Sequence, residues 1–507
     1  MKNFNALYVW LLLLFIEIGC SSDTSDDVVL KEVIEEPNPE PTPVPDPVPS
    51  MVYTVDNISD TYFEVAGEEN ASQWGPYNVH DPSIIKVDNI YYCFNTDVSF
   101  GSDVRPGIQI RKSEDLINWE FLGWAFNGLP SKGSAYIQGE GTAPFNSLWA
   151  PFVMQVGDEY RLYYSLSSST GRLSVIGLAT STSPEGPWVE KDLVVTSKGD
   201  GTVQTNAIDP SVVVSPSGEH WFYYGSAYDG IYKLKLNPTT GLALVNGDKG
   251  LRVAQRGFTN GIVNGNIEGP EVIYNEKQGK YYMFISYDWL QTKYNVRVGR
   301  SDNPAGPFYD FNGLDINTEV DNGPMILAPY KFNDHPGWQG VSHPAVFSDD
   351  LGQYFMAHQG RPGENSFFMV LHVRKIYWTE DGWPIVSPER FANIQQTALT
   401  AENIAGDYEE IKLGYRIVPG YADEQKTADF QFSTSLQLNI DGSINADNTN
   451  SWSYDAPWLT LNYNSGETIV KLHVEQGRDW ENKVATTILL SGLDNEGTAI
   501  WGKKIND

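Results

Sequence analysis

Five segments of the chain share a proline that opens an apolar strand, and the residue before that proline often has an ionisable side chain. In each segment a turn rich in Gly, Asp or Asn and then an aromatic-rich strand follow the apolar strand. The positions before the proline hold Asp81, Ala150, Asp209, Gly269 with Glu268 beside it, and His343. Three carboxylates and one imidazole at equivalent positions could hold a metal ion or perform acid/base chemistry on a neutral substrate.

Motifs for other chemistries are missing from the sequence. It contains no HExxH, no EF-hand loop and no Cys-His finger, which are the usual metal-site patterns. GxSxG and a phosphate-binding Walker loop are absent as well, so nucleophilic serine and phosphate chemistry lack their usual support. Paired carboxylates acting on an acetal remain, one protonating the leaving oxygen while the other activates a water or attacks directly. An Asp before Pro is by itself a common turn former, but the alignment of all these groups at one repeat position favours the chemical interpretation.

The elements that must position these residues follow from the repeat. The shared prolines are Pro82, Pro151, Pro210, Pro270 and Pro344, at spacings of 69, 59, 60 and 74 residues. A second hairpin pattern continues the unit, so each unit predicts a four-stranded sheet. Five such sheets arranged radially close into a β-propeller, whose innermost strands line a central channel. We therefore expect an all-β chain with a five-bladed propeller at residues 56–396 and the ionisable residues at one mouth of its channel.

The C-terminal part of the chain has a different pattern. From residue 397 onward, segments such as STSLQLNIDGSI and TIVKLHVEQGRDW alternate apolar and polar residues, and NIDG and DNEG are turn signals. Residues 397–507 are therefore predicted to form a small β-sandwich or barrel domain. No cluster of acids or histidines marks this domain as catalytic, so we expect it to support the propeller or to contribute to a substrate groove.

Composition excludes several partners. The 507 residues carry 34 Lys and Arg against 65 Asp and Glu, and the net charge of −31 would repel nucleic acid and anionic membrane surfaces. Aromatic residues, Gly and Pro are plentiful, which is typical of short strands joined by tight turns. An acidic, aromatic-rich β protein is compatible with neutral sugars as ligands.

The N-terminus has the features of an exported lipoprotein. Residues 1–20 contain an apolar run that is too short to span a bilayer, and we interpret them as a signal peptide. Gly19-Cys20 resembles the lipobox of bacterial lipoproteins, in which the cysteine is acylated, so Cys20 is the predicted lipidation site. Residues 21–55 form a predicted acidic, Pro-rich linker. We expect the protein on the outer membrane or cell surface, or facing the periplasm, held to the membrane only by this lipid.

The motifs in combination resemble a known family. HDPSI, NAIDPSVVVSPSGEHWFYYGS, NIEGPEVIYNEKQGKYYMFISYD, HPAVF and IYWTEDGWPIVSPE look like glycoside hydrolase family 43, and most like its two-domain arabinanases, which cut α-1,5-linked arabinan. The resemblance covers about residues 75–507. It implies that Asp81 is the general base, that Glu268 is the general acid, and that Asp209 orients the acid and raises its pKa. It also implies inversion of configuration, with arabinan or an arabino-oligosaccharide as the partner of a monomeric enzyme.

The same resemblance implies a metal ion. In these arabinanases a histidine at the position of His343 helps to hold an ion, usually calcium, with a shell of waters in the channel. A single imidazole is a weak ligand for calcium, so water would supply most of the coordination. A plain hydrogen-bonded histidine is the alternative, and we expect no organic cofactor.

Substrate-binding residues are predicted from the way sugar rings stack on aromatic faces. Trp149 lies before the proline of the second repeat, at the mouth, and is the first candidate. Trp74, Phe94 and Tyr228 follow. Asn206 is a plausible hydrogen-bonding partner for a sugar, because it lies close in sequence to the third carboxylate.

Other functions fit the same residues. The main hypothesis is cleavage of internal α-1,5-arabinofuranosyl bonds, and its nearest rival is an exo-acting arabinofuranosidase or β-xylosidase with the same carboxylates. A retaining sucrose- or fructan-processing propeller is disfavoured, since the first and third repeats read HDPSI and IDPSV rather than an NDPNG-like motif. A non-catalytic glycan-binding lipoprotein would need no intact acid.

Overall fold

The computed structural model describes residues 51–98, 104–200, 205–256, 258–259, 262–263, 266–318, 323–414 and 428–505. The predicted signal peptide, Cys20 and residues 21–50 of the predicted linker lie outside these ranges. No helix in the described part of the chain combines the length and apolarity needed to cross a membrane.

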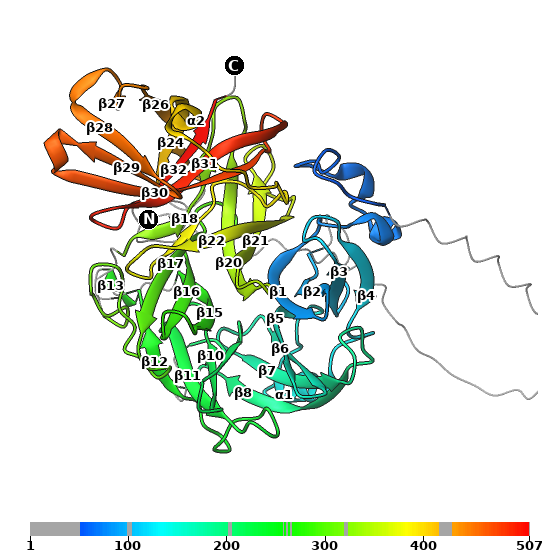
Figure 1. Cartoon of the computed structure of the whole chain (residues 1–507). Helices are drawn as coiled ribbons and strands as arrows, with labels where there is room; N and C mark the ends of the chain where they lie inside the picture. The colour runs from blue at the N-terminus through cyan, green and yellow to red at the C-terminus, as the bar shows by residue number, and fades with distance from the viewer. Residues whose placement is uncertain are drawn as a thin grey trace, which may run out of the picture. The chain divides into compact units, whose positions relative to one another are not determined.

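Five antiparallel sheets follow one another around a ring, as Figure 1 shows, and confirm the predicted five-bladed propeller. Blade 1 contains β1 (His80–Val87), β2 (Ile90–Thr96), β3 (Ile108–Ser113) and β4 (Glu120–Trp124). After α1 (Ser131–Gly139), blade 2 contains β5 (Trp149–Val156), β6 (Glu159–Ser167), β7 (Ser174–Ser181) and β8 (Val189–Ser197). Blade 3 contains β9 (Ser211–Val214), β10 (His220–Tyr224), β11 (Ile231–Leu236) and β12 (Leu251–Ala254).

A short hairpin of β13 (Phe258–Thr259) and β14 (Ile262–Val263) precedes the fourth blade. Blade 4 contains β15 (Ile267–Asn275), β16 (Lys280–Tyr287), β17 (Asn295–Ser301) and β18 (Met325–Leu327). Blade 5 contains β19 (Tyr330–Lys331), β20 (Trp338–Ser348), β21 (Tyr354–Pro362), β22 (Val370–Trp378) and β23 (Pro384–Val386). The strand β25 (Gln431–Phe432) adds to this sheet, parallel to β19.

The C-terminal domain is a closed barrel, so of the two predicted forms the barrel is the correct one. Its strands are β24 (Gly406–Lys412), β26 (Thr434–Leu438), β27 (Ser443–Ile444), β28 (Asp447–Asp455), β29 (Trp458–Tyr463), β30 (Thr468–Asp479), β31 (Val484–Asp494) and β32 (Ala499–Lys504). The short helix α2 (Ala401–Ile404) precedes it, and η3 (Asn464–Gly466) joins β29 to β30. Side chains such as Tyr408, Leu461 and Leu490 fill the centre of the barrel.

One backbone distortion recurs in all five blades at the positions singled out by the sequence. These residues have φ values between +37° and +59°: Asp81, Ala150, Asp209, Gly269 and His343. In β1, β5, β15 and β20 the pairing register shifts at this point, as in a β-bulge. A bulge re-aims a side chain at a strand end, and Asp tolerates positive φ better than most residues. The five repeat positions are thus structurally equivalent.

Hydrogen bonds from these bulges tie each blade to the one before it. The Asp81 backbone N–H donates to Gln359 Oε1 of β21 (3.0 Å), which joins blade 1 to blade 5 and closes the ring. Three other junctions use hydroxyls: Ala150 N–H to Thr96 Oγ1 (2.7 Å), Asp209 N–H to Ser165 Oγ (3.1 Å) and His343 N–H to Ser286 Oγ (3.0 Å). The fifth is the bond from Gly269 N–H to Asp209 Oδ2 (3.0 Å), which uses one of the carboxylates.

The N-terminal segment packs across the junction between blades 1 and 5. It includes η1 (Phe63–Val65) and η2 (Glu68–Gln73). Tyr62 stacks on Tyr77 with ring centroids 4.5 Å apart, and its hydroxyl donates to the Met369 carbonyl oxygen (3.1 Å). Tyr53 is 2% exposed in the same core, so the predicted linker end at residue 55 is wrong and the packed chain begins before it.

Candidate active site

The structure brings Asp81, Asp209, Glu268 and His343 together at one mouth of the channel. Asp81 Oδ1 lies 3.0 Å from His343 Nδ1. Asp209 Oδ2 accepts the N–H of Gly269, the residue after Glu268. Asp81 and Asp209 are buried, and Glu268 and His343 are partly exposed. Asp81 and Asp209 are 128 residues apart in the chain, and Asp209 and Glu268 are 59 residues apart. These distant carboxylates therefore share one site, as the repeat predicts.

Asp81 is held in its ionised form. Thr96 Oγ1 donates to its Oδ2 (2.7 Å), while His80 Nδ1 and His343 Nδ1 both lie within 3.0 Å of its Oδ1. Burial alone would raise the pKa of Asp81, but the charges of His343 and His80 outweigh burial and hold it well below its usual range. Burial alone would likewise lower the pKa of His343, but Asp81 chiefly raises it to about 9. An ionised carboxylate can take a proton from a water.

Asp209 has the opposite electrostatic environment. Burial raises its pKa well above the usual value, and the negative charges of Glu268 and Asp81 add to that rise, although His343 opposes it. The sequence argument expected the third carboxylate to raise the pKa of Glu268, whereas the structure assigns a raised pKa to Asp209 itself. Burial and the neighbouring charges therefore favour a proton on Asp209.

Both oxygens of Glu268 accept hydroxyl hydrogen bonds. Ser226 Oγ donates to Oε2 (2.7 Å), and the Tyr294 hydroxyl donates to Oε1 (2.8 Å). Burial, with the charge of Glu268, raises the pKa of Tyr294 well above its usual value, so its hydroxyl stays protonated. These two bonds fix the direction in which the carboxyl group of Glu268 points.

Sequence reasoning missed the residues that hold the carboxylates. His80 stands directly before Asp81, and Ser226 ends the aromatic strand of the third repeat, so adjacency to a motif was the only available signal. Tyr294 lies on a loop between β16 and β17, and no sequence motif next to it indicated a functional role. Its role depends on the turn of residues 289–294, in which the Trp289 carbonyl accepts the Tyr294 N–H (3.1 Å).

The predicted stacking residues fall into two groups. Trp149 is partly exposed, 5.4 Å from the ring of Phe145, and Tyr228 is 40% exposed. Trp74 and Phe94 are both 0% exposed, so their prediction as stacking residues is wrong. Phe94 belongs to an inner strand that is covered on both faces by neighbouring sheets, and a buried ring offers no face to a sugar.

The predicted polar contact, Asn206, reaches the site surface. Ser174 Oγ donates to its Oδ1 (3.2 Å), and its backbone N–H donates to the Ser226 carbonyl (3.4 Å). Its side-chain NH₂ has no hydrogen-bond acceptor among the described residues and is available to a ligand.

The donor atoms at the mouth fit only an ion that keeps most of its water. Within the described residues, no three carboxylate, imidazole or thiol ligand atoms of the mouth lie within 4.8 Å of one another. His343 Nδ1 already contacts Asp81, so a neutral His343 would offer Nε2 to the ion. Such a set suits a hydrated, oxygen-preferring cation better than a dehydrated metal in a closed cage.

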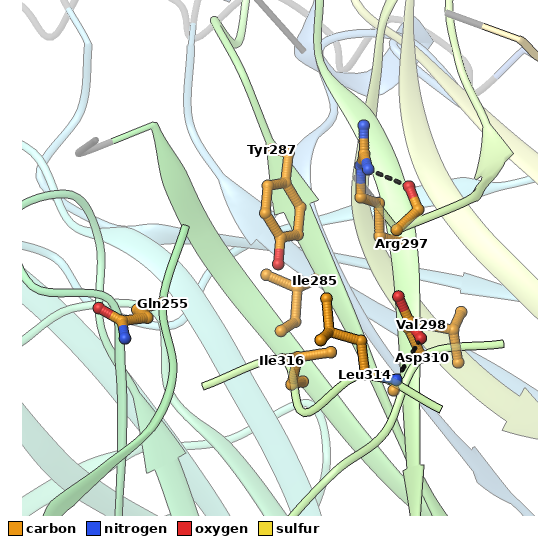
Figure 2. A pocket seen from close by; sticks show the side chains of 10 residues that line it. Gln255, Ile285, Tyr287, Arg297, Val298, Asp310, Leu314 and Ile316 are labelled. Atoms are coloured by element: carbon orange, nitrogen blue, oxygen red, sulfur yellow. Dashed lines mark hydrogen bonds between the residues drawn. The ribbon is translucent and has the colours of Figure 1, made fainter. Parts of the chain in front are cut away.

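Two cavities lie away from the mouth. A cavity of about 20 Å³ in blade 4 is lined by residues that include Ile285, Tyr287 and Asp310. Figure 2 shows their side chains. This cavity has room for one water and none of the four mouth residues lines it. A larger cavity of about 560 Å³ is lined by later residues of the innermost strands, including Ser83, Phe152 and Glu271, and so lies further along the channel.

Glu271 is a partly exposed acid that lines this larger cavity, and the sequence reasoning did not single it out. Ser211 Oγ donates to its Oε2 (3.0 Å), and the Val346 N–H donates to its Oε1 (3.2 Å). Burial raises the pKa of Glu271 to about 7.

Five blades that gather paired carboxylates at one end of their channel define a propeller hydrolase of the glycosidase type. The chain belongs to glycosyl hydrolases family 43: the family model matches residues 75–384, and a model of a C-terminal lipocalin-like domain matches residues 388–502.

Individual relatives match most of the chain. An extracellular endo-α-(1→5)-L-arabinanase of Thermotoga petrophila is 30% identical over 88% of this chain and 97% of its own. An extracellular endo-α-(1→5)-L-arabinanase 2 of Bacillus subtilis is 28% identical over 84% of this chain and 93% of its own. The crystal structure of an endo-1,5-α-L-arabinanase from Thermotoga petrophila matches with a TM-score of 0.72 and 29% identity, covering 86% of this chain and 99% of that one.

Proposed function

We propose that this hydrolase cleaves internal α-1,5-L-arabinofuranosyl bonds of arabinan with inversion of configuration. The observation that carries the proposal is the mouth itself, where an ionised Asp81 faces a second pair of carboxylates, Asp209 and Glu268. Relatives named as endo-arabinanases match both the propeller and the barrel, which supports arabinan as the substrate.

The proposed reaction gives each of the three carboxylates a different role. Asp81 takes a proton from a water as the water oxygen bonds to the anomeric carbon, and the bond from that carbon to the glycosidic oxygen breaks. Glu268 gives its proton to the departing oxygen. Asp209 orients Glu268 through the Gly269 N–H. Ser226 and Tyr294 keep the carboxyl group of Glu268 aimed at the leaving oxygen.

We further propose that His343 helps to hold a calcium ion whose remaining ligands are mostly waters. When bound, the ion would supply positive charge next to the carboxylates. Calcium content of the purified protein, measured by elemental analysis for wild type and for His343→Ala, tests the assignment. A bound equivalent that His343→Ala loses is the expected result, and equal calcium in both proteins would contradict it.

The proposed reaction is tested by the size of the products. Linear arabinan, branched arabinan, xylan and fructan are incubated with the enzyme, and early products are separated by chain length. Arabino-oligosaccharides from linear arabinan are expected. Arabinose alone would instead indicate an exo-acting enzyme, xylose a β-xylosidase, and hydrolysis of fructan alone a different propeller class.

A non-catalytic glycan-binding role is separated by Glu268→Gln. This substitution keeps the hydrogen-bonding shape but removes the acid proton. We expect a loss of about three orders of magnitude or more in kcat on arabinan, with sugar binding and the folded state retained. Unchanged hydrolysis by Glu268→Gln would exclude Glu268 as the acid.

We also propose that the protein is exported and anchored through Cys20. Two relatives are named as extracellular, and the leader carries the lipobox-like Gly19-Cys20. Cys20→Ala should release the protein from the membrane fraction, while the wild type stays bound. We expect the released protein to be a monomer, which gel filtration with light scattering checks.

A further inference from the structure

We propose that Arg172, Asn206 and Tyr228, on the wall between blades 2 and 3, form the subsite that binds the leaving-group sugar. The inference rests on the proposed function and specifies which part of the polysaccharide this wall recognises. Arg172 lies on the loop between β6 and β7, Tyr228 on the loop between β10 and β11, and Asn206 on the segment that enters β9.

Ser226 connects this wall to the proposed acid. Its hydroxyl donates to Glu268 Oε2 (2.7 Å), and its carbonyl accepts the Asn206 N–H (3.4 Å). The next residue, Ala227, donates its N–H to the Ile267 carbonyl (2.9 Å), so the loop that carries Tyr228 is fixed to the strand that carries Glu268. The segment that carries Asn206 and the loop that carries Tyr228 are therefore both fixed beside the strand of the proposed acid.

The backbone conformation, rather than packing in a core, sets the position of the Tyr228 ring. Ala227 and Tyr228 have φ values of +57° and +49°, and the ring remains 40% exposed. Non-glycine residues in this conformation cost free energy and gather at ligand-binding sites. A tyrosine displayed in this way offers an apolar face and a polar edge, which suits a sugar ring.

Arg172 orders that ring. Its guanidinium lies over the ring of Tyr228, with its central carbon 5.0 Å from the centroid. The Arg172 carbonyl accepts a hydrogen bond from Ser197 Oγ (2.7 Å), and Ser197 Oγ in turn accepts the N–H of Ala207 (2.9 Å). The loop of blade 2 is thereby tied to the segment that carries Asn206.

Asn206 adds a directed polar contact. Its Oδ1 is occupied by Ser174 Oγ (3.2 Å), which orients the amide and leaves its NH₂ without an acceptor among the described residues. Sugar hydroxyls and ring oxygens accept hydrogen bonds from such a group. The wall thus combines a stacking face, a cation and an oriented donor.

The position of Asp81 determines which sugar this wall binds. The base and the acid act from opposite sides of the anomeric carbon in an inverting reaction. Asp81 belongs to blade 1, whereas Ser226 places the wall next to Glu268. The wall is therefore on the side to which the leaving sugar departs.

The test compares two substrates that differ in the leaving group. Tyr228→Ala, Arg172→Ala and Asn206→Ala are assayed on a linear α-1,5-arabino-oligosaccharide and on α-L-arabinofuranosyl fluoride, whose leaving group carries no sugar ring. The loss in kcat/KM on the oligosaccharide is expected to exceed the loss on the fluoride by about tenfold or more for Tyr228→Ala. Tyr228→Phe keeps the ring and should recover most of the oligosaccharide activity.

Tyr309→Ala is the matched control, because Tyr309 is a 43% exposed tyrosine between β17 and β18 of blade 4. It should behave as wild type on both substrates, with unfolding curves verifying that every variant is folded. If Tyr228→Ala loses equal kcat/KM on both substrates, or loses none on either, the inference is wrong. The proposed function would still stand, because it depends on the activity of the wild type. If the wild-type enzyme hydrolyses neither substrate, both the proposed function and this inference are wrong.

Discussion

At the scale of single residues, the site works by giving similar groups different environments. Asp81 contacts two imidazoles, which keep it ionised, whereas the burial of Asp209 and the nearby charge of Glu268 raise the pKa of Asp209. Glu268 differs from both, since two hydroxyls from blades 3 and 4 hold its oxygens. Each role therefore depends on neighbours supplied by other blades.

The hydroxyl of Tyr294 is the most direct test of that dependence. Tyr294→Phe keeps the ring and removes one donor to Glu268, and an ordinary hydrogen bond is typically worth about 0.5–1.5 kcal/mol. We expect kcat on arabinan to fall by about twofold to tenfold with little change in KM, because the acid is aimed less well. Steady-state kinetics measure this effect, and Tyr309→Phe serves as the control. An unchanged kcat would show that Tyr294 does not position the acid.

Glu271 predicts a pH-dependent stability. Its pKa is about 7 in the folded protein and close to 4.5 in the unfolded chain, so between these values the folded state binds the extra proton. Stability contributed by this group is therefore present below about pH 4.5 and is lost as pH rises through 7. Relative to Glu271→Gln, the wild type should lose up to about 3 kcal/mol of unfolding free energy between pH 5 and pH 8. Denaturant unfolding at the two pH values measures this difference, and parallel pH profiles would contradict it.

At the scale of elements, five equivalent positions with positive φ position the chemistry, four of them at bulges. Each of these residues donates its N–H to the preceding blade, so every blade junction also sets the position of a mouth residue. At residue 269 the bulge must be glycine for a further reason, because a Cβ there would lie 3.0 Å from His343 Nδ1.

A comparison of Gly269→Ala with Gly157→Ala separates the effect of backbone strain from the effect of a steric contact with His343. The two glycines have nearly equal φ values, +58° and +59°, but a Cβ at residue 157 would meet no atom within 4 Å. Both substitutions should cost about 1–2 kcal/mol of unfolding free energy from positive φ. Only Gly269→Ala should also lower kcat, by about tenfold or more, since it displaces His343. Equal kcat values for the two variants would show that a side chain at residue 269 does not disturb His343.

The strand pattern accounts for what the sequence could and could not predict. The repeat predicted the blades and the meeting of Asp81, Asp209 and Glu268, because an element that recurs around a ring places equivalent residues at one end. It could not separate Phe94 from exposed aromatics, because inner strands lie between two sheets and lose the alternation that marks a solvent face. Trp74 ends the short helix η2 and packs against Phe121 and Trp124 of blade 1, a contact that no sequence spacing indicates. Ser226 and Tyr294 were missed because contacts between blades do not follow a regular spacing along the sequence.

At the scale of the whole molecule, the barrel is joined to the propeller by a buried charge cluster. Lys503 of β32 is 1% exposed and its Nζ lies 2.8–3.0 Å from oxygens of Glu389, Asp479 and Glu481. Glu389 follows the last propeller strand, whereas the other three belong to the barrel. Burial alone would lower the pKa of Lys503, but the three carboxylates raise it, so the ammonium occupies the place that a metal ion would take.

Removing that ammonium should destabilise both domains together. Lys503→Met leaves three buried carboxylates without their cation, and such a break typically costs about 3–5 kcal/mol. Lys471→Met is the control, because Lys471 is 60% exposed and its ion pair should contribute at most about 1 kcal/mol. Calorimetry should show a lower Tm for Lys503→Met alone. A Tm for Lys503→Met equal to that of wild type would show that the cluster does not stabilise the molecule.

In the proposed mechanism the three carboxylates act in one inverting reaction, so the configuration of the first product distinguishes this mechanism from its alternatives. Proton NMR during the first minutes of hydrolysis of a linear α-1,5-arabino-oligosaccharide resolves the anomers before they equilibrate. The β-anomer should appear first with wild type, and Asp81→Asn, Asp209→Asn and Glu268→Gln should each form it at least about a thousandfold more slowly while remaining folded. First appearance of the α-anomer, or a wild-type rate in any of the three variants, would contradict the mechanism.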